Sequence, residues 1–212
     1  MGLLNGLKWP GQNRDDDSSG ADELTRPDGV ALRHYDSGME LAEQGMYTEA
    51  LEEFQRAVRR CPQFTEAYHH KGVMHDMLGR LDKAIDCYEQ TIRISPGYAE
   101  AYNDLGVAYT KLGRGMESIK TFLRALRLRP DYVEALNNLG LAYYNWGSYA
   151  EAIKACQKAI QLDPAYPNSY YSIGLVYIDL KEKDLALEAQ RKLRELDPEA
   201  AHQLLEQIHK QL

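Results

Sequence analysis

Features that would indicate a membrane, secreted or nucleic-acid-binding protein are scarce in this sequence of 212 residues. It has no run of about 18 apolar residues, so we expect no integral membrane segment. Its three cysteines, Cys61, Cys87 and Cys156, are too few and odd in number to form a disulfide framework. Positive charge is also limited, because 25 lysines and arginines face 32 acidic residues and the net charge is −7. A nucleic-acid partner is therefore not expected, since such proteins carry a basic stripe.

Motifs of common catalytic sites are missing as well. The sequence has no GxxxxGK[ST] loop for binding phosphates and no GxSxG turn that would expose a nucleophilic serine. The chain also lacks the long apolar core and small-residue cleavage site of a signal peptide. We therefore expect a cytoplasmic protein that is not an enzyme.

The sequence instead contains a repeat, and its clearest copy is Val133–Tyr166. Apolar residues at helical spacing predict one helix over about 133–146 and a second over about 149–161. Gly147 separates the two helices, and Pro164 ends the second because proline has no N–H to donate. A helical hairpin of this size cannot cover its own apolar face, so it requires neighbours.

The same landmarks recur every 34 residues along most of the chain. They are Gly38, Gly72, Gly106, Gly140 and Gly174; Pro62, Pro96, Pro130, Pro164 and Pro198; Ala50, Ala84, Ser118, Ala152 and Ala186; and Gly45, Gly79, Gly113, Gly147 and Lys181. A helix–turn–helix period of this length, with these landmarks, is similar to the tetratricopeptide pattern. From Ala31 to Ala200 the chain resembles the tetratricopeptide-repeat family in five uninterrupted repeats. Their predicted bounds are 31–64, 65–98, 99–132, 133–166 and 167–200.

This resemblance implies an all-α fold, a right-handed α-solenoid of stacked helix pairs. Residues 1–30 do not follow the repeat, and their polar, acidic composition predicts a disordered tail. The alternative is that Leu3, Leu4, Leu7 and Trp9 form a short anchor on a tether. Residues 199–212 place Leu204, Leu205, Ile208 and Leu212 on one helical face, which predicts a C-terminal capping helix. The alternative is that this face binds a partner or a second copy of the chain.

Two repeats depart from the pattern in their second helices. In the third repeat, Gly115 is expected to loosen the helix start by roughly 1 kcal/mol relative to alanine. In the fifth, Lys183, Gln190 and Arg194 replace aromatic or apolar residues, which predicts weaker packing there.

The resemblance also implies a site for a ligand. In this family the first helices of successive repeats line a concave groove, along which peptides usually lie. The residues at the corresponding positions are Tyr35, His69, His70, Asn103, Asp104, Asn137, Asn138, Leu141, Tyr144, Tyr171 and Leu175. We expect Asn103, Asn137 and Asn138 to lie at the surface, where their amides could pair with any peptide backbone.

The expected groove is rich in acidic side chains, which oppose only Lys111. They are Asp36, Glu66, Asp76, Glu100, Asp104, Glu134 and Asp179. The lysines and arginines of the family's carboxylate clamp for acidic tails are absent. We therefore predict a neutral or basic ligand with apolar side chains. The alternative is that these acidic residues are ordinary solvated helix faces.

A cluster of His69, His70, His75 and Asp76 suggests a metal site. However, His34 and His75 occupy positions where other repeats have tyrosines that pack helix against helix. We therefore expect no metal and no other cofactor.

The sequence as a whole predicts a non-catalytic protein–protein interaction module, an adaptor or assembly factor that holds a peptide or partner helix in its groove. The alternative is a structural scaffold that self-associates through its ends or its C-terminal helix and forms a homo-oligomer.

Overall fold

The computed structural model describes residues 26–212, and every regular element in that range is an α-helix. The predicted anchor residues Leu3, Leu4, Leu7 and Trp9 lie outside the described residues. The helices are α1 (Gly29–Glu43), α2 (Tyr47–Arg60), α3 (Thr65–Met77), α4 (Leu81–Ile94), α5 (Ala99–Lys111), α6 (Gly115–Leu128), α7 (Val133–Asn145), α8 (Tyr149–Leu162), α9 (Pro167–Asp179), α10 (Lys183–Leu196) and α11 (Pro198–Gln211). None of these helices is long and apolar enough to cross a membrane.

The turns within the pairs are short and share one backbone conformation. Gly45, Gly79, Gly113 and Gly147 have φ between +70° and +80°, a left-handed conformation that glycine adopts without steric cost. Lys181 occupies the same place in the fifth pair with φ of 63°. Each turn reverses the chain after the first helix of its pair, so the two helices pack side by side.

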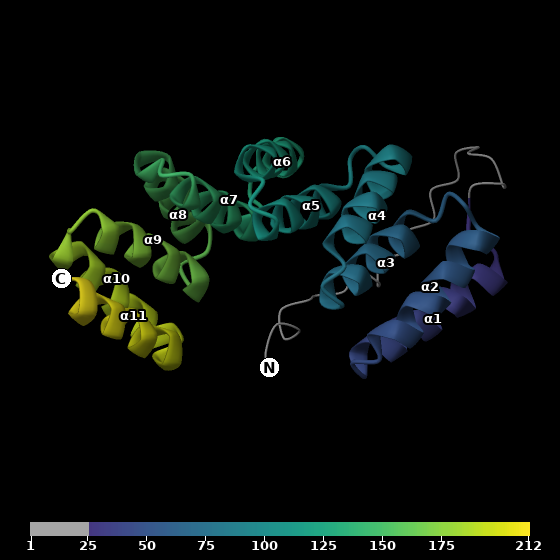
Figure 1. The fold of residues 1–212 in the computed structure, drawn as a ribbon, viewed down its shortest axis with the longest axis horizontal. Coiled ribbons are helices and arrows are strands. Elements are labelled where there is room, and N and C mark those ends of the chain that lie inside the picture. The colour runs from purple at the N-terminus through teal and green to yellow at the C-terminus, as the bar shows by residue number, and fades with distance from the viewer. Residues whose placement is uncertain (1–25) are drawn as a thin grey trace.

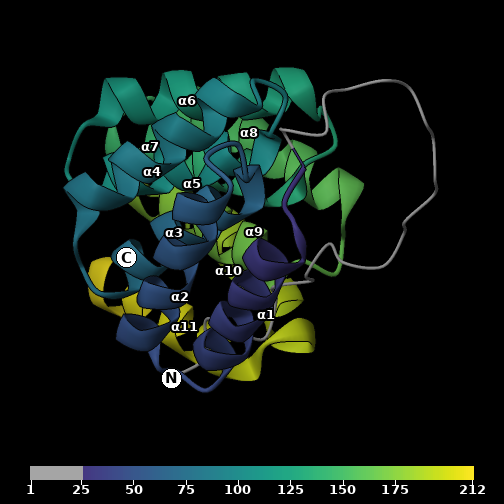
Figure 2. The same cartoon turned by 90° about the vertical axis from the view of Figure 1, so that its right-hand side faces the viewer.

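The helix pairs follow one another along a curve rather than in a straight row (Figures 1 and 2). From α3 onward the first helices approach one another directly, α3 against α5, α5 against α7, α7 against α9 and α9 against α11. No two second helices among the described residues make comparable contact. The first helices therefore lie on the inside of the curve and the second helices on the outside.

Close packing within each of the first four pairs depends on a glycine of the first helix. A Cβ atom at Gly72 would lie 2.6 Å from the ring of Tyr88, and one at Gly140 would lie 2.5 Å from Cys156 Sγ. Tyr88 and Cys156 are almost completely buried as a result. In the first four pairs the glycine therefore marks the place where the second helix inserts a side chain against the first, whereas Gly174 of the fifth pair faces Leu204 of the capping helix α11, 2.6 Å from a Cβ atom placed there.

Helix α11 covers the last repeat, as the sequence predicts. Leu204 and Ile208 are fully buried in one cluster with Leu193 of α10 and Ile178 of α9. The side chain of Asp197 accepts hydrogen bonds from the first backbone N–H groups of α11, which fixes its start. The apolar face of α11 is thus occupied within the molecule.

Two expectations from the sequence require correction. Gln190 takes part in the packing of α10, because it is buried and its Nε2 donates to the backbone oxygen of Ala201 at 3.3 Å, whereas Lys183 and Arg194 are exposed, in line with the expectation of weaker packing there. Gly115 provides space for an aromatic ring, since a Cβ atom there would lie 2.9 Å from Trp146 Cε3. An alanine at residue 115 would therefore displace Trp146, which offsets the gain in helix propensity.

Candidate functional site

The inner surface carries one partly buried apolar residue from each first helix. The five residues are Met39, Val73, Val107, Leu141 and Leu175, and we call them the apolar stripe. All five are partly accessible, and four of them, Met39, Val73, Val107 and Leu175, pack against the apolar clusters beside them. The repeat therefore places one partly exposed apolar residue at the same position of every first helix.

Hydrogen bonds between neighbouring first helices run beside the apolar stripe. They join the fifth residue of one repeat to the sixth residue of the next, a separation of 35 residues, in Tyr35–His70 at 3.3 Å, His69–Asp104 at 2.8 Å, Asn103–Asn138 at 3.1 Å and Asn137–Ser172 at 2.8 Å. The series continues onto the capping helix, where Gln207 Nε2 donates to the Tyr171 hydroxyl at 3.1 Å. We call these five contacts the inter-repeat ladder.

The inter-repeat ladder overturns the expected role of the asparagines. Asn103 is 0% exposed and Asn137 is 2% exposed, so the prediction that both lie at the surface is wrong. His69 and His70 are buried as well. These side chains point into the contact between adjacent first helices, and buried polar groups must find partners there. Their cross-repeat hydrogen bonds therefore hold the repeats together, and burial keeps these side chains from a peptide backbone; His69 Nδ1 alone among these groups is buried without a partner.

The other predicted groove residues remain partly open on the inner surface. They are Tyr35, Asp104, Asn138, Leu141, Tyr144, Tyr171 and Leu175. Leu141 and Leu175 belong to the apolar stripe, while Asn138 and Tyr171 belong to the inter-repeat ladder. A ligand on this surface would meet apolar groups flanked by hydroxyl and amide groups.

The acidic side chains of the groove are partly neutralised by neighbours. Lys111 Nζ contacts both carboxylate oxygens of Asp76 at 2.7 Å, and Arg129 pairs with Glu100. Both pairs lie near the surface, where an ion pair contributes little to stability. The groove is therefore less acidic than a count of its carboxylates along the sequence indicates.

Glu134 is a carboxyl group of this surface whose surroundings raise its pKa. The residue is exposed as a whole, but its carboxyl end turns inward to accept a hydrogen bond from Asn103 Nδ2 at 3.2 Å. Removal from water raises the pKa of Glu134, and the nearby charge of Asp104 raises it further, while the bond from Asn103 opposes the rise. A positive group on a ligand would relieve this crowding of negative charge.

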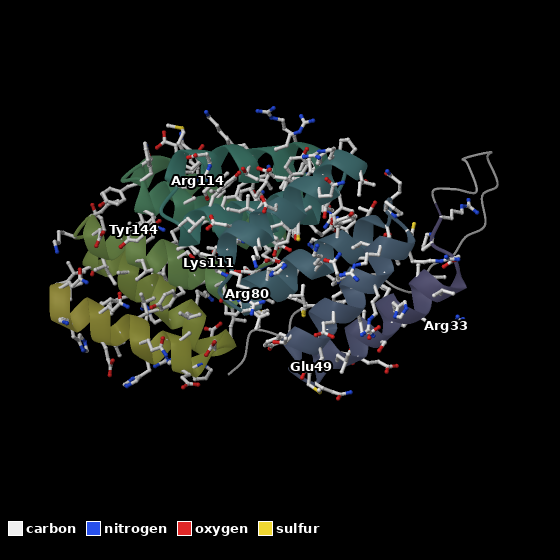
Figure 3. The ribbon with its side chains drawn as sticks, turned by 45° about the vertical axis from the view of Figure 1, so that its right-hand side comes forward. Arg33, Glu49, Arg80, Lys111, Arg114 and Tyr144 are labelled. Carbon is white, nitrogen blue, oxygen red and sulfur yellow. The ribbon has the colours of Figure 1, made fainter. Side chains whose placement is uncertain are left out.

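The end of the groove nearest the helix-to-helix turns shows the same spacing of 35 residues. Asp76 pairs with Lys111, and Tyr144 lies beside Asp179, whose hydrogen bond and charge, after burial, raise the Tyr144 pKa to about 12. Figure 3 shows Tyr144, Lys111 and Arg80 one after another across successive repeats. Tyr144 therefore keeps its proton at neutral pH and serves as a hydrogen-bond donor.

A small hollow at this rim was not predicted from the sequence. It holds about 270 Å³ and is lined by Thr110, Gly113, Gly115, Ser118, Ala142, Asn145 and Trp146. Trp146 is 54% exposed, which is high for the largest apolar side chain. The sequence feature that could have indicated this hollow is a glycine at residue 115 together with a tryptophan at residue 146, because the glycine leaves the space that the indole ring covers.

The histidine cluster is divided by the structure. His69 and His70 face the inter-repeat contact, whereas His75 lies on another side of α3. Among residues 26–212, no three histidine, cysteine, aspartate or glutamate side chains are grouped so that they could hold a metal ion.

Comparison with known proteins agrees with the repeat architecture. Models of the tetratricopeptide repeat match residues 103–167 and 167–199, and a model of the TPR repeat matches residues 77–113. The chain is a tetratricopeptide-repeat protein. Comparison with curated proteins finds no match.

Solved structures show the same fold. A crystal structure of MamA protein is 26% identical, with 82% of this chain and 94% of that chain covered and a TM-score of 0.69. YrrB, described as a TPR protein with an unusual peptide-binding site, is 22% identical over 85% and 92% of the two chains, with a TM-score of 0.67. The APC/C hetero-tetramer Cut9–Hcn1 is 22% identical over 86% of this chain and 37% of that one, with a TM-score of 0.76.

Proposed function

We propose that this protein is a non-catalytic interaction module whose inner surface binds an extended peptide or a helix of a partner protein. Tetratricopeptide repeats are typically protein–protein interaction modules. The observation that carries the proposal is the apolar stripe, which leaves one partly exposed apolar side chain on each first helix. YrrB, with its described peptide-binding site, offers a structural parallel at the level of the fold.

The ligand that suits this surface is apolar along one side and neutral or basic overall. Leu141 and Leu175 would contact its apolar side chains, and Asn138 would donate a hydrogen bond to its backbone or polar groups. The Tyr144 hydroxyl, which donates to Asp179, would accept one. Asp36 and Glu66 lie exposed and have no ion pair among the described residues, so they would attract positive groups. Such complementarity speeds encounter more than it strengthens the complex.

The rim hollow beside Trp146 would accept a single apolar side chain of the same ligand. Exposed tryptophans are enriched among the residues that dominate binding energy at protein interfaces. Thr110 and Asn145 provide polar groups at its edge. The groove would therefore bind an anchoring side chain at one end and a longer apolar segment along its length.

The proposal is tested by comparing how the wild-type chain and two matched variants bind a captured partner. Leu141→Arg places a charge on the apolar stripe, and Leu162→Arg places the same charge on an exposed leucine of α8, on the outer helix layer. A partner is identified by pull-down with the wild-type chain, and its binding segment is then measured as a synthetic peptide by fluorescence polarisation. We expect Leu141→Arg to weaken binding by about tenfold or more, since it removes a central apolar contact, and Leu162→Arg to leave it unchanged.

Equal binding by the wild type and Leu141→Arg would show that the groove is not the site. Self-association remains the second candidate function, but the apolar face of α11 is covered by α9 and α10 and is not available for it. Sedimentation at increasing protein concentration tests it directly, because a scaffold gains mass with concentration and a monomeric module does not. The cytoplasm is our proposed compartment, and imaging of the tagged full chain tests it.

A further inference from the structure

A second hollow lies on the side of α3 that faces away from the groove. Lys71 and His75 are one helical turn apart on α3, and Val73 between them points the opposite way, toward the groove. The hollow holds about 540 Å³ between α2, α3 and α4, and its lining residues are Leu51, Glu52, Gln55, Arg56, Arg59, Lys71, His75, Arg80 and Lys83. We call it the outer pocket. Pockets of roughly 300–1,000 Å³ bind small molecules in proteins.

The outer pocket exists because two core positions of the repeat carry polar residues here. The next three repeats place Leu105 with Tyr109, Leu139 with Tyr143, and Ile173 with Tyr177 at the positions of Lys71 and His75. The three aliphatic residues are buried, whereas Lys71 remains partly exposed. The equivalent hollow beside Ile173 and Tyr177 holds about 290 Å³, close to half the volume.

The lining of the outer pocket is strongly positive in a chain with a net charge of −7. Of its five lysines and arginines, Arg56 is paired with Glu52 and Glu53 of its own helix. The other four have no carboxylate at ion-pair distance among residues 26–212, and they are Arg59, Lys71, Arg80 and Lys83. Unpaired like charges repel one another across a confined space, so the free pocket favours the entry of an anion.

His75 is the second polar residue that replaces a core position in the wall of the outer pocket. The residue is only 7% exposed, and its Nδ1 is buried without a hydrogen-bond partner in the described structure. His69 Nδ1 and Ser169 Oγ are buried without a partner in the same way, so the His75 Nδ1 atom does not by itself indicate a ligand, and the charge and shape of the pocket carry the argument. Burial and the charges of Lys71, Lys83 and Arg80 lower the His75 pKa to about 4, so the ring is neutral at neutral pH.

From these observations we propose that the outer pocket binds a small molecule that bears two or more linked phosphate groups. Arginine forks and lysine ammonium groups are the usual protein donors to phosphate oxygens. Four unpaired cations exceed what one carboxylate or a single phosphate would neutralise, whereas a diphosphate supplies about three negative charges. The pocket lies on the opposite side of α3 from the groove, so this inference is independent of the proposed peptide binding.

Pyrophosphate is the probe that tests this inference, by isothermal titration calorimetry at constant ionic strength. The test variant is Lys71→Leu/His75→Tyr, which installs the residues that the third and fourth repeats carry and is therefore expected to fold. Its control is Lys154→Leu on α8, which removes the same charge away from the pocket. We expect the wild type and the control to bind alike, and the test variant to bind at least about tenfold more weakly, because a charged donor is lost and the pocket is filled.

Two further measurements separate the pocket from general attraction of anions. Amide spectra of the isotope-labelled chain should show shifts centred on residues 71–83, and ADP in place of pyrophosphate shows whether a nucleoside adds affinity. The inference would be overturned if the wild type bound no pyrophosphate, or if the test variant bound it equally well. Equal binding of sulfate, or stronger binding of a glutamate-rich peptide, would also overturn it.

Discussion

Asn138 Nδ2 donates a hydrogen bond to Asn103 Oδ1 over 3.1 Å, although the two residues lie in neighbouring repeats. Asn103 in turn donates through its own Nδ2 to Glu134 and Asp104, both at 3.2 Å. A side chain with no exposed surface thus has its amide oxygen and its amide nitrogen paired. Because each repeat of a solenoid contacts only its neighbours, such bonds couple one repeat to the next.

Replacement of Asn103 by alanine is expected to destabilise the protein by about 1–3 kcal/mol, since it leaves the partners of a buried amide unpaired. Asn145→Ala is the matched control, because Asn145 is exposed on a first helix and a surface change of this kind costs less than about 0.5 kcal/mol. Urea unfolding followed by circular dichroism measures both. Equal midpoints for the two variants would contradict a structural role for Asn103.

The contact between Gly140 and Cys156 gives a second prediction. A Cβ atom at Gly140 would lie 2.5 Å from Cys156 Sγ, well inside van der Waals contact. Gly140→Ala is therefore expected to cost about 1–3 kcal/mol through overpacking of a filled core. Cys156→Ala removes the opposing sulfur, so the double variant should recover part of that loss in a double-mutant cycle of unfolding free energies. Strict additivity would show that the clash is not with Cys156.

The sequence predicted the helices closely because each one depends on local patterns. The helix predicted over about 133–146 is α7 (Val133–Asn145), and that predicted over about 149–161 is α8 (Tyr149–Leu162). Their limits follow from Gly147 and Pro164, whose backbone preferences act within a few residues. The apolar face of α11 could be predicted from the sequence in the same way, and Leu204 is buried as a capping helix requires.

The direction in which the side chain of the fifth residue of each repeat points could not be predicted in the same way. Whether Asn103 faces a ligand or the next repeat depends on how far successive first helices rotate and approach. That rotation arises from all the contacts between two repeats, so the sequence of one repeat does not determine it. The outer pocket was not predicted for a related reason. Lys71 and His75 form part of a pocket only together with Arg59 of the preceding repeat and Lys83, and the sequence does not show that these residues lie around them.

The turn at Lys181 gives a third prediction. Its φ of 63° lies in the left-handed region, where a side chain costs about 1–2 kcal/mol and glycine costs none. Glycine loses more backbone entropy on folding, so we expect Lys181→Gly to stabilise the protein by a net of roughly 0.5–1 kcal/mol. Gly147→Lys, at the equivalent turn of the preceding pair, should shift the unfolding midpoint in the opposite direction. Two shifts of the same sign would rule out backbone strain as the cause.

The last prediction concerns the dependence of stability on pH. Burial lowers the His70 pKa to about 4 from an ordinary 6.5, and the neighbouring His69 lowers it further, while Glu66 and Asp104 oppose the shift. Between these values the unfolded chain binds a proton at residue 70 that the folded chain does not. Stability from this group is therefore complete above pH 6.5 and is lost as the pH falls toward 4, by at most about 1.4 kcal/mol per unit.

His70→Asn removes the titrating group and keeps a polar side chain, the residue that the fourth repeat has at this position in Asn138. Around residue 70 the other facing groups, Tyr35, Glu66, His69 and Asp104, are unchanged in this variant. Carboxylates elsewhere titrate in both proteins, so the informative quantity is the difference between the two urea-unfolding curves at each pH. We expect that difference to change steadily from pH 6.5 to 4 in favour of the variant. A difference that stays constant over this interval would mean that His70 is not held neutral in the folded chain.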